Sequence, residues 1–159
     1  MYLIDSNVFM QAANSYYAFD LVPAFWTWVE GKLGTDLFTI EPVKEEVLAQ
    51  NDALATWFKS VDDPSWVLDV ESDGIQLQMP VITQHCVDYG YKLNGISKFL
   101  SGADPWVIAC AREMNWNVVT HEEPNPMTKK RVKIPDVCAS LGVKHVTGFK
   151  MLRDLGFSA

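Results

Sequence analysis

The sequence predicts an α/β protein built as a three-layer sandwich, with a central parallel sheet of about four to five strands and helices on both faces. Short apolar segments of strand length alternate with segments of helical spacing, so helices connect consecutive strands. The 159 residues are 48% hydrophobic, which is enough to bury a sizeable core in a single domain over residues 1–159. Charged residues make up 21%, as in ordinary globular proteins.

The first half of the chain contains three expected strands and four expected helices. Leu37–Ile40 is a run of apolar and β-branched residues that is typical of a buried strand. Pro23 and Pro42 favour helix starts because proline suits the first turn, and Gly34 favours a helix end. The expected order is strand Tyr2–Ile4, helix Asn7–Ala13 with Ser6 as its candidate cap, helix Pro23–Leu33, strand Leu37–Ile40, a helix opening at Pro42, helix Ala53–Val61 and a weak strand Trp66–Val70.

The second half continues the alternation and contains one long helix. Pro80 lies inside this helix and is expected to kink or split it. Asp104-Pro105 is a strong helix start, with the aspartate as the candidate cap. The expected order is helix Ile75–Tyr91, short helix Ile96–Leu100, helix Asp104–Met114, strand Asn117–Thr120, loop Glu122–Thr128, an extended piece Val132–Ile134, a helix from Pro135-Asp136 to Leu141, strand Lys144–Thr147 and helix Phe149–Leu155.

Composition excludes several classes of protein. No apolar run reaches the length of a membrane span, and the N-terminus lacks the pattern of a secretory signal. The three cysteines are odd in number, far apart and without a CxxC pair, so a zinc knuckle and a disulfide framework are both disfavoured. Buried, reduced thiols in a cytoplasmic protein are the expected state.

The net charge of -7 argues against binding to nucleic acid by charge alone, because phosphate neutralisation needs lysine and arginine. It leaves open a nucleic-acid enzyme whose carboxylates are offset by metal ions. Basic residues also cluster at one place in the chain. This basic run consists of Lys129, Lys130, Arg131 and Lys133, and it is either a solvated loop or a contact for RNA phosphates.

Four carboxylates are expected to meet at one edge of the sheet. Asp5 ends the first strand, and Glu122 follows the strand that includes Thr120. Glu46 and Asp104 can reach the same edge from helices, and ligands of such sheets bind beyond the carboxyl ends of the strands. Like charges at about 4 Å repel by about 4 kcal/mol at an effective dielectric of 20, so the cluster needs protons or cations. Oxygen ligands without cysteine favour Mg²⁺ or Mn²⁺.

Four stretches of the chain together resemble a PIN-domain ribonuclease, and more narrowly the PIN-like toxin of a bacterial toxin–antitoxin pair. They are YLIDSNVFM, EEVLAQ, GADPWVIACAREMNWNVVTHE and VKIPDVCASLGVKHV, and the resemblance covers essentially the whole chain. It implies a PIN-like fold and hydrolysis of RNA phosphodiester bonds with Mg²⁺ or Mn²⁺. It further implies a cognate antitoxin protein and a homodimer. The residues at the family's metal-binding positions are Asp5, Glu46, Asp104 and Glu122.

Two further positions match residues that orient the site in this family. Asn7 matches the polar residue beside the first aspartate, and Thr120 matches the hydroxyl residue before the last acid. The sequence also departs from the family pattern. The fourth acid is usually aspartate, whereas here Glu122 is followed by Glu123, which competes with it as the ligand. The long segment EEPNPMTKKRVKIPDVC replaces a short link, and Asp136 within it is either an additional ligand or a helix cap.

Two other functions remain open at this stage. A PIN-like fold without catalysis would serve as a binding module, and glutamate at the fourth acid position leaves room for it. Phosphatases that form an aspartyl phosphate also place an aspartate after a strand, but Asn7 stands where their second acid would be. His121 invites a role as general base, although a lone histidine at a strand end is more often a hydrogen-bonded structural residue.

Overall fold

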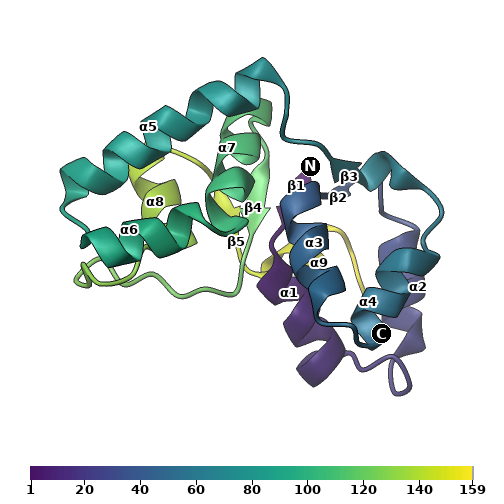
Figure 1. The fold of residues 1–159 in the computed structure, drawn as a ribbon. Coiled ribbons are helices and arrows are strands. Elements are labelled where there is room, and N and C mark those ends of the chain that lie inside the picture. Colours follow the sequence, from purple (N-terminus) through teal and green to yellow (C-terminus); the bar gives the residue numbers. More distant parts are fainter. Residues whose placement is uncertain (159) are drawn as a thin grey trace.

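The computed structural model describes residues 1–158, and a five-stranded sheet lies at its centre (Figure 1). Every strand pair is parallel, and the strand order is β3-β2-β1-β4-β5. The first strand therefore lies in the middle, with its neighbours added to both sides. The strands are β1 (Tyr2–Ile4), β2 (Leu37–Ile40), β3 (Val67–Leu68), β4 (Asn117–Val119) and β5 (His145–Val146).

Helices connect the strands, as the alternation in the sequence predicts. A π-helical turn, Ala12–Tyr16, extends the first helix, and a short 3₁₀ turn, Pro64–Trp66, precedes β3. The α-helices are α1 (Ser6–Gln11), α2 (Pro23–Glu30), α3 (Glu41–Ala49), α4 (Ala53–Ser60), α5 (Asp73–Tyr89), α6 (Leu93–Leu100), α7 (Asp104–Met114), α8 (Ile134–Leu141) and α9 (Gly148–Asp154).

Three expectations about these elements were wrong. Asp5, not Ser6, caps α1, because its side chain accepts the N–H of Ser6 while Ser6 is already helical. Pro80 does not split α5, which is continuous over Asp73–Tyr89. Pro80 is exposed, so water can satisfy the carbonyl that loses its donor. Ala103, not Asp104, is the N-cap residue of α7, and no side chain caps that helix.

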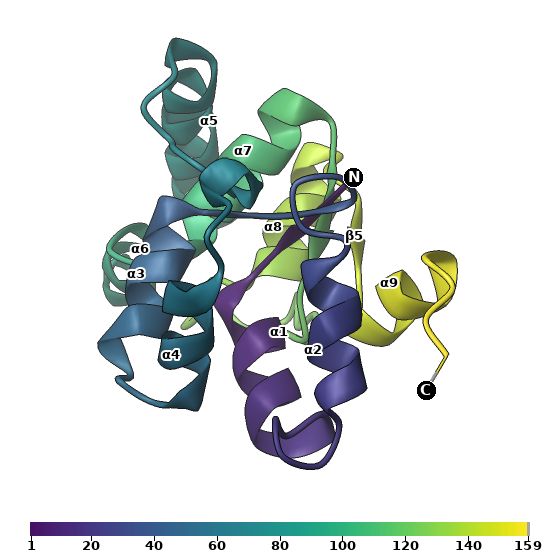
Figure 2. The ribbon, with the colours of Figure 1, turned by 90° about the vertical axis from the view of Figure 1, so that its right-hand side faces the viewer.

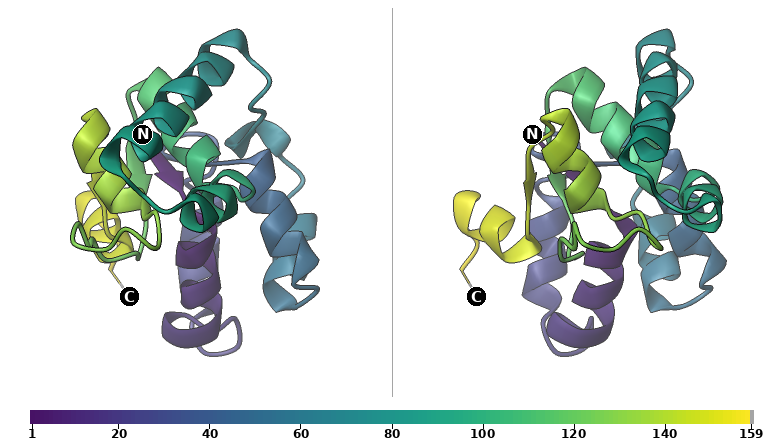
Figure 3. Two further views of the ribbon diagram at one scale, coloured as in Figure 1. Left: turned by 60° about the vertical axis from the view of Figure 1, so that its left-hand side comes forward. Right: turned by 90° about the vertical axis from the view of Figure 1, so that its left-hand side faces the viewer.

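The core lies on both faces of the sheet. On one face α7 packs against β1, β2 and β4, and α5 packs along α7. On the other face, Ile4 and Leu37 meet Phe25 of α2 and Met151 of α9. Figure 2 shows α1 and α2 in front of the sheet, and the reverse views show α5, α7 and α8 covering the opposite side (Figure 3). The predicted three layers are therefore present.

Two further expectations concern the cysteines and membranes. Cys86, Cys110 and Cys138 are all buried and free, and burial raises the pKa of each thiol to about 11 or 12. They are inert core residues at neutral pH. Within residues 1–158, no helix has both the length and the apolar character needed to cross a lipid bilayer.

The strand order reverses direction between β1 and β4. The chain adds β2 and β3 on one side of β1, and then crosses to add β4 and β5 on the other. Open parallel sheets bind ligands at such a switch point, outside the carboxyl ends of the two strands. Asp5 follows β1, and Thr120, His121 and Glu122 follow β4, so these residues stand at the switch point.

Candidate metal centre

Asp5 lies at the carboxyl end of β1, and its side chain is 1% exposed. One carboxylate oxygen accepts the N–H of Ser6 at 2.7 Å, and the other accepts the hydroxyl of Thr120 at 3.2 Å. Burial, together with the negative charges of Asp104 and Glu122, raises the pKa of Asp5 to about 8. Within residues 1–158, the groups that donate hydrogen bonds to this carboxyl are all neutral and belong to Ser6 and Thr120. The helix cap alone therefore does not explain an acid that is buried without a cation.

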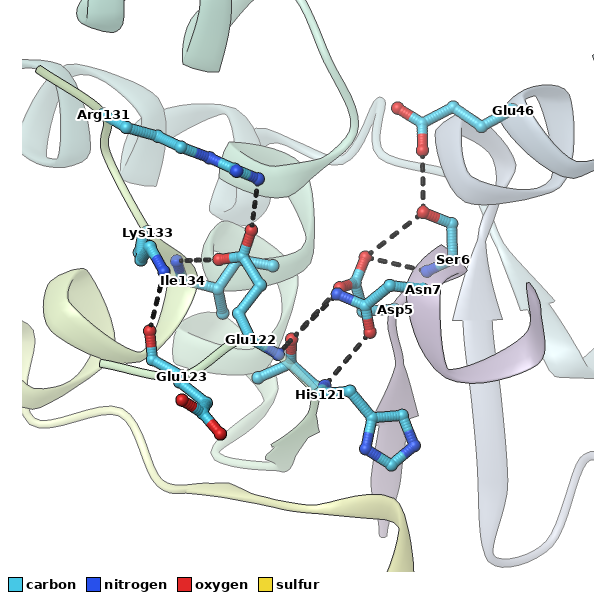
Figure 4. Close-up of polar contacts among 11 residues, drawn as sticks. Asp5, Ser6, Asn7, Glu46, His121, Glu122, Glu123, Arg131, Lys133 and Ile134 are labelled. Atoms are coloured by element: carbon cyan, nitrogen blue, oxygen red, sulfur yellow. Dashed lines mark hydrogen bonds and ion pairs between the residues drawn. The ribbon is translucent and has the colours of Figure 1, made fainter. Parts of the chain in front are cut away.

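Asn7 and Thr120 join the ends of β1 and β4. The Asn7 amide donates to the Thr120 hydroxyl oxygen at 3.2 Å, and its own oxygen accepts the backbone N–H of His121 at 3.0 Å (Figure 4). Thr120 is 2% exposed and also accepts the N–H of Glu122 at 3.2 Å. Asn7 thus reaches Asp5 through Thr120, and these contacts hold the start of the segment that follows β4.

Glu46 enters the site from α3 and is held at both carboxylate oxygens. The Ser6 hydroxyl donates to one oxygen at 2.9 Å, and the backbone N–H of Ala103 donates to the other at 3.0 Å. Glu46 is half-buried, whereas Glu45, its competitor in the sequence, is exposed. Ser6 is a site residue that sequence reasoning missed. Its neighbour Asp5 offered a simple helix start, and nothing local revealed a partner 40 positions away.

Asp104 is the first helical residue of α7, and its carboxyl makes no capping hydrogen bond. Burial, together with the charges of Glu122 and Glu46, raises its pKa to about 6, although Arg131 acts in the opposite direction. The simplest structural reason for an aspartate before a proline is a helix cap, and that reason does not apply here. Among residues 1–158, this carboxyl has no hydrogen bond or ion pair within the chain, and it lies beside other carboxyls.

Glu122 is close to the other acids, but its carboxylate is bound elsewhere. Its side chain is 12% exposed, and one oxygen lies 3.2 Å from Nη2 of Arg131. The other oxygen accepts the backbone N–H of Ile134, the first residue of α8, at 2.8 Å. In Figure 4 the Glu122 side chain points toward Arg131 and Ile134, away from Asp5.

The two alternative ligands lie outside the cluster. Glu123 is exposed, and its backbone carbonyl accepts from Lys133 at 3.1 Å. Asp136 is 8% exposed, and both of its oxygens accept the backbone N–H of Asn125, at 3.1 and 2.9 Å. Asp136 therefore holds the loop that follows β4.

The four predicted acids are electrostatic neighbours. The negative charges of Asp104 and Glu122 raise the pKa of Asp5, and those of Glu122 and Glu46 raise the pKa of Asp104. They do not converge on one point, however. Among residues 1–158, no three His, Cys, Asp or Glu side chains lie close enough together to hold a metal ion. The donor chemistry suits Mg²⁺ or Mn²⁺, because carboxylate oxygens are their preferred protein ligands. Gathering these oxygens around one cation requires side chains of the cluster to move, and Glu122, whose oxygens face Arg131 and Ile134, is one of them.

A cleft of about 370 Å³ opens beside these acids. Glu46 and Asp104 line one part of it, and basic side chains line another. Lys98 of α6 is among them, and sequence reasoning missed it because it is a single lysine far from the basic run in the sequence. The basic side chains in the wall are Lys98, Lys130 and Arg131.

The rest of the basic run is engaged outside this cleft. Nζ of Lys129 lies 3.2 Å from the centre of the Tyr89 ring, in a cation–π contact. Nζ of Lys133 donates to the carbonyl of Glu123. Of the basic run, Lys130 and Arg131 therefore line the cleft, whereas Lys129 and Lys133 contact other parts of the chain.

His121 faces away from the acids. Its ring lies 6.2 Å from the ring of Tyr16 and 6.0 Å from that of Phe149, between centroids. Burial lowers the pKa of the imidazole, so it is neutral at neutral pH. This arrangement favours the structural interpretation of His121 over a general base, and it surrounds the ring with aromatic neighbours.

Comparison with known proteins agrees with the geometry at the level of the fold. The family model described as "Domain of unknown function (DUF4411)" matches residues 2–159. No curated protein matches the chain. The chain is similar to one in the solved structure described as "Structure of FitAB bound to IR36 DNA fragment". That alignment has a TM-score of 0.59 and 13% identity, and covers 92% of this chain and 94% of the other. This likeness confirms the predicted PIN-like fold.

Proposed function

The chain belongs to the DUF4411 family, and from its PIN-like fold and the geometry of its acidic site we propose that it is a divalent-metal-dependent ribonuclease. One observation supports this most. Asp104 opens α7 without capping it, and its pKa is raised beside three other acids at the switch point of the sheet. A fold has no structural reason to gather such charges, so a cation is the simplest explanation for them.

The proposed ligands are Asp5, Glu46, Asp104 and Glu122. A Mg²⁺ or Mn²⁺ ion there would activate a water molecule and neutralise charge on the scissile phosphate. Ser6 positions Glu46 through its hydroxyl, and Thr120 positions Asp5. Asn7 holds Thr120 in place. The side chains thus offer hydrogen bonds and charge, and no serine, cysteine or histidine is needed as a nucleophile.

The basic wall of the cleft is the proposed phosphate-binding surface. Lys98, Lys130 and Arg131 line the same cleft as Glu46 and Asp104, so a nucleic-acid strand would present one phosphate to the acids and another to these cations. Local charge of this kind would allow a chain with a net charge of -7 to bind RNA.

We further propose that the protein is the toxin of a toxin–antitoxin pair and that it forms a homodimer. The similar solved chain comes from a structure of FitAB bound to a DNA fragment. A cognate antitoxin would insert arginine or lysine between the acids and so block the cleft. Co-purification with the product of a neighbouring small reading frame tests this part of the proposal.

A non-catalytic binding module is the second candidate. It is favoured by two observations: Glu122 is bound by Arg131 and Ile134, and no three acidic or histidine side chains within residues 1–158 form a cation site. Such a module would take up no Mn²⁺ through its carboxylates. Calorimetric titration with Mn²⁺ therefore separates the two candidates.

The decisive test is cleavage of total RNA in Mn²⁺ by the wild type and by Asp104→Asn. We expect the substitution to reduce cleavage by about 100-fold or more, as removal of a metal ligand does. Asp73→Asn is the matched control, because Asp73 also lies in the first turn of a helix but is exposed and remote from the cleft. Equal Mn²⁺-dependent cleavage by Asp104→Asn and the wild type would refute the site.

A further inference from the structure

Arg131 places a positive charge among the carboxylates of the site. Its Nη2 lies 3.2 Å from Oε1 of Glu122, and its side chain lines the cleft together with Glu46 and Asp104. It is also close enough to Asp104 to act on that carboxyl electrostatically. This guanidinium therefore occupies the neighbourhood in which the proposed metal ion would carry positive charge.

The same contact keeps the acids apart. Arg131 takes one oxygen of Glu122, and the N–H of Ile134 takes the other. With both oxygens bound, Glu122 points away from Asp5 (Figure 4). A cation shared by Asp5 and Glu122 needs the Glu122 carboxylate to leave at least one of these partners.

The side chain of Arg131 can move while its backbone stays in place. The carbonyl of Lys129 accepts the N–H of Lys92 at 2.8 Å. Gly95 of α6 packs so closely on the carbonyl of Lys130 that a methyl group at this glycine would overlap it. The Arg131 side chain, in contrast, is 65% exposed. Only Nη2 contacts Glu122, and a guanidinium has five N–H donors, so most are available to an anion in the cleft.

We propose that Arg131 is an internal counter-ion that exchanges with the divalent cation and then binds the phosphate of the nucleic acid. In the metal-free protein it neutralises Glu122. With a divalent cation bound, the Glu122 carboxylate would turn toward Asp5, and the Arg131 guanidinium would leave Glu122 and face only the cleft. This inference rests on the proposed function. It makes the binding of metal and the binding of phosphate mutually reinforcing, because each favours the same arrangement of Arg131.

The first test compares Mn²⁺ affinity by calorimetry in three proteins. Arg131→Gln removes the competitor, so we expect Mn²⁺ to bind about two- to five-fold more tightly than to the wild type, the range expected for one exposed ion pair. Lys130→Gln removes the same charge from the same cleft without removing a contact to Glu122. It therefore measures the effect of removing one positive charge from the cleft. We expect its gain in Mn²⁺ affinity to be less than half of that of Arg131→Gln.

The second test observes Arg131 directly. The chain has three arginines, so its ¹⁵N spectrum has three Nε signals, and the one missing in Arg131→Gln belongs to Arg131. We expect Mg²⁺ to shift this signal and to leave those of Arg112 and Arg153 in place. Inorganic phosphate added after Mg²⁺ is expected to shift it again, and by more than the same concentration of phosphate does without Mg²⁺, because Arg131 is then free of Glu122.

The outcomes separate this inference from the proposed function. If the wild type takes up no Mn²⁺, both are wrong. If the wild type takes up Mn²⁺ but Arg131→Gln and Lys130→Gln gain the same Mn²⁺ affinity, the exchange proposal is wrong and the proposed metal site stands. The exchange proposal is also wrong if Mg²⁺ does not shift the Arg131 Nε signal, since the guanidinium would then stay bound to Glu122.

Discussion

Replacing Asp5 by asparagine is expected to stabilise the metal-free protein while it removes the metal site. The Asp5 carboxyl is 1% exposed, and burial with the charges of Asp104 and Glu122 raises its pKa from 3.8 to about 8. The folded state therefore keeps a proton that the unfolded state has released. The contribution of Asp5 to the free energy of unfolding is therefore fully present below about pH 4, and it is lost steadily as the pH rises toward about 8.

The size of the effect follows from the same values. One pKa unit corresponds to about 1.4 kcal/mol, so a carboxyl moved from 3.8 to about 8 weakens the fold by at most about 6 kcal/mol above pH 8. Asparagine keeps the hydrogen bond from Ser6. It loses the one from Thr120, whose oxygen already accepts from Asn7 and Glu122, at a cost of about 1 kcal/mol. Allowing for relaxation around the charge, we expect a net gain of about 2 kcal/mol at about pH 8.

Urea unfolding between about pH 4 and pH 8, with and without Mg²⁺, measures the free energies of unfolding of Asp5→Asn and the wild type. The difference between Asp5→Asn and the wild type should grow with pH in the absence of metal. Mg²⁺ should stabilise the wild type but not Asp5→Asn, because it binds only the intact site. Asp73→Asn serves as the control, since Asp73 is exposed. A variant that is less stable than the wild type by the same amount at every pH would refute the reasoning, because Asp5 would then be only a helix cap.

Two further predictions concern residues that hold the site. Ser6→Ala removes the hydroxyl that donates to Glu46, so we expect several-fold weaker Mn²⁺ binding in calorimetry; Ser6→Thr keeps the hydroxyl and should restore the affinity. Gly95→Ala forces a methyl group onto the Lys130 carbonyl and should lower the free energy of unfolding by about 1–3 kcal/mol. Gly31→Ala meets only ordinary contacts and should be neutral in the same urea titration, and equal effects of the two would contradict the close packing of α6 on the basic run.

Most elements were predictable because their signals are local. The apolar run Leu37–Ile40 became β2 within its expected bounds, and Pro23 opened α2 as the first-turn preference of proline predicts. The sequence predictions were wrong where contacts between distant segments decide the bounds or the continuity of a helix. The sequence predicts that α6 starts at Ile96, but Lys92 is fixed by the carbonyl of Lys129, and the helix begins directly after Lys92. Pro80 was expected to disrupt α5, yet the helix packs along α7 and stays continuous.

The sequence by itself determined which acids follow strands or open helices, and the strand–helix alternation determined that they gather at one edge of a parallel sheet. Both follow from short-range periodicity and from the direction of parallel strands. Only the tertiary structure decided what each side chain contacts. It paired Glu122 with Arg131, joined Ser6 to Glu46, and stacked Lys129 on Tyr89. A side chain's partner depends on the packing of segments far apart in the chain, and local spacing contains no record of that packing.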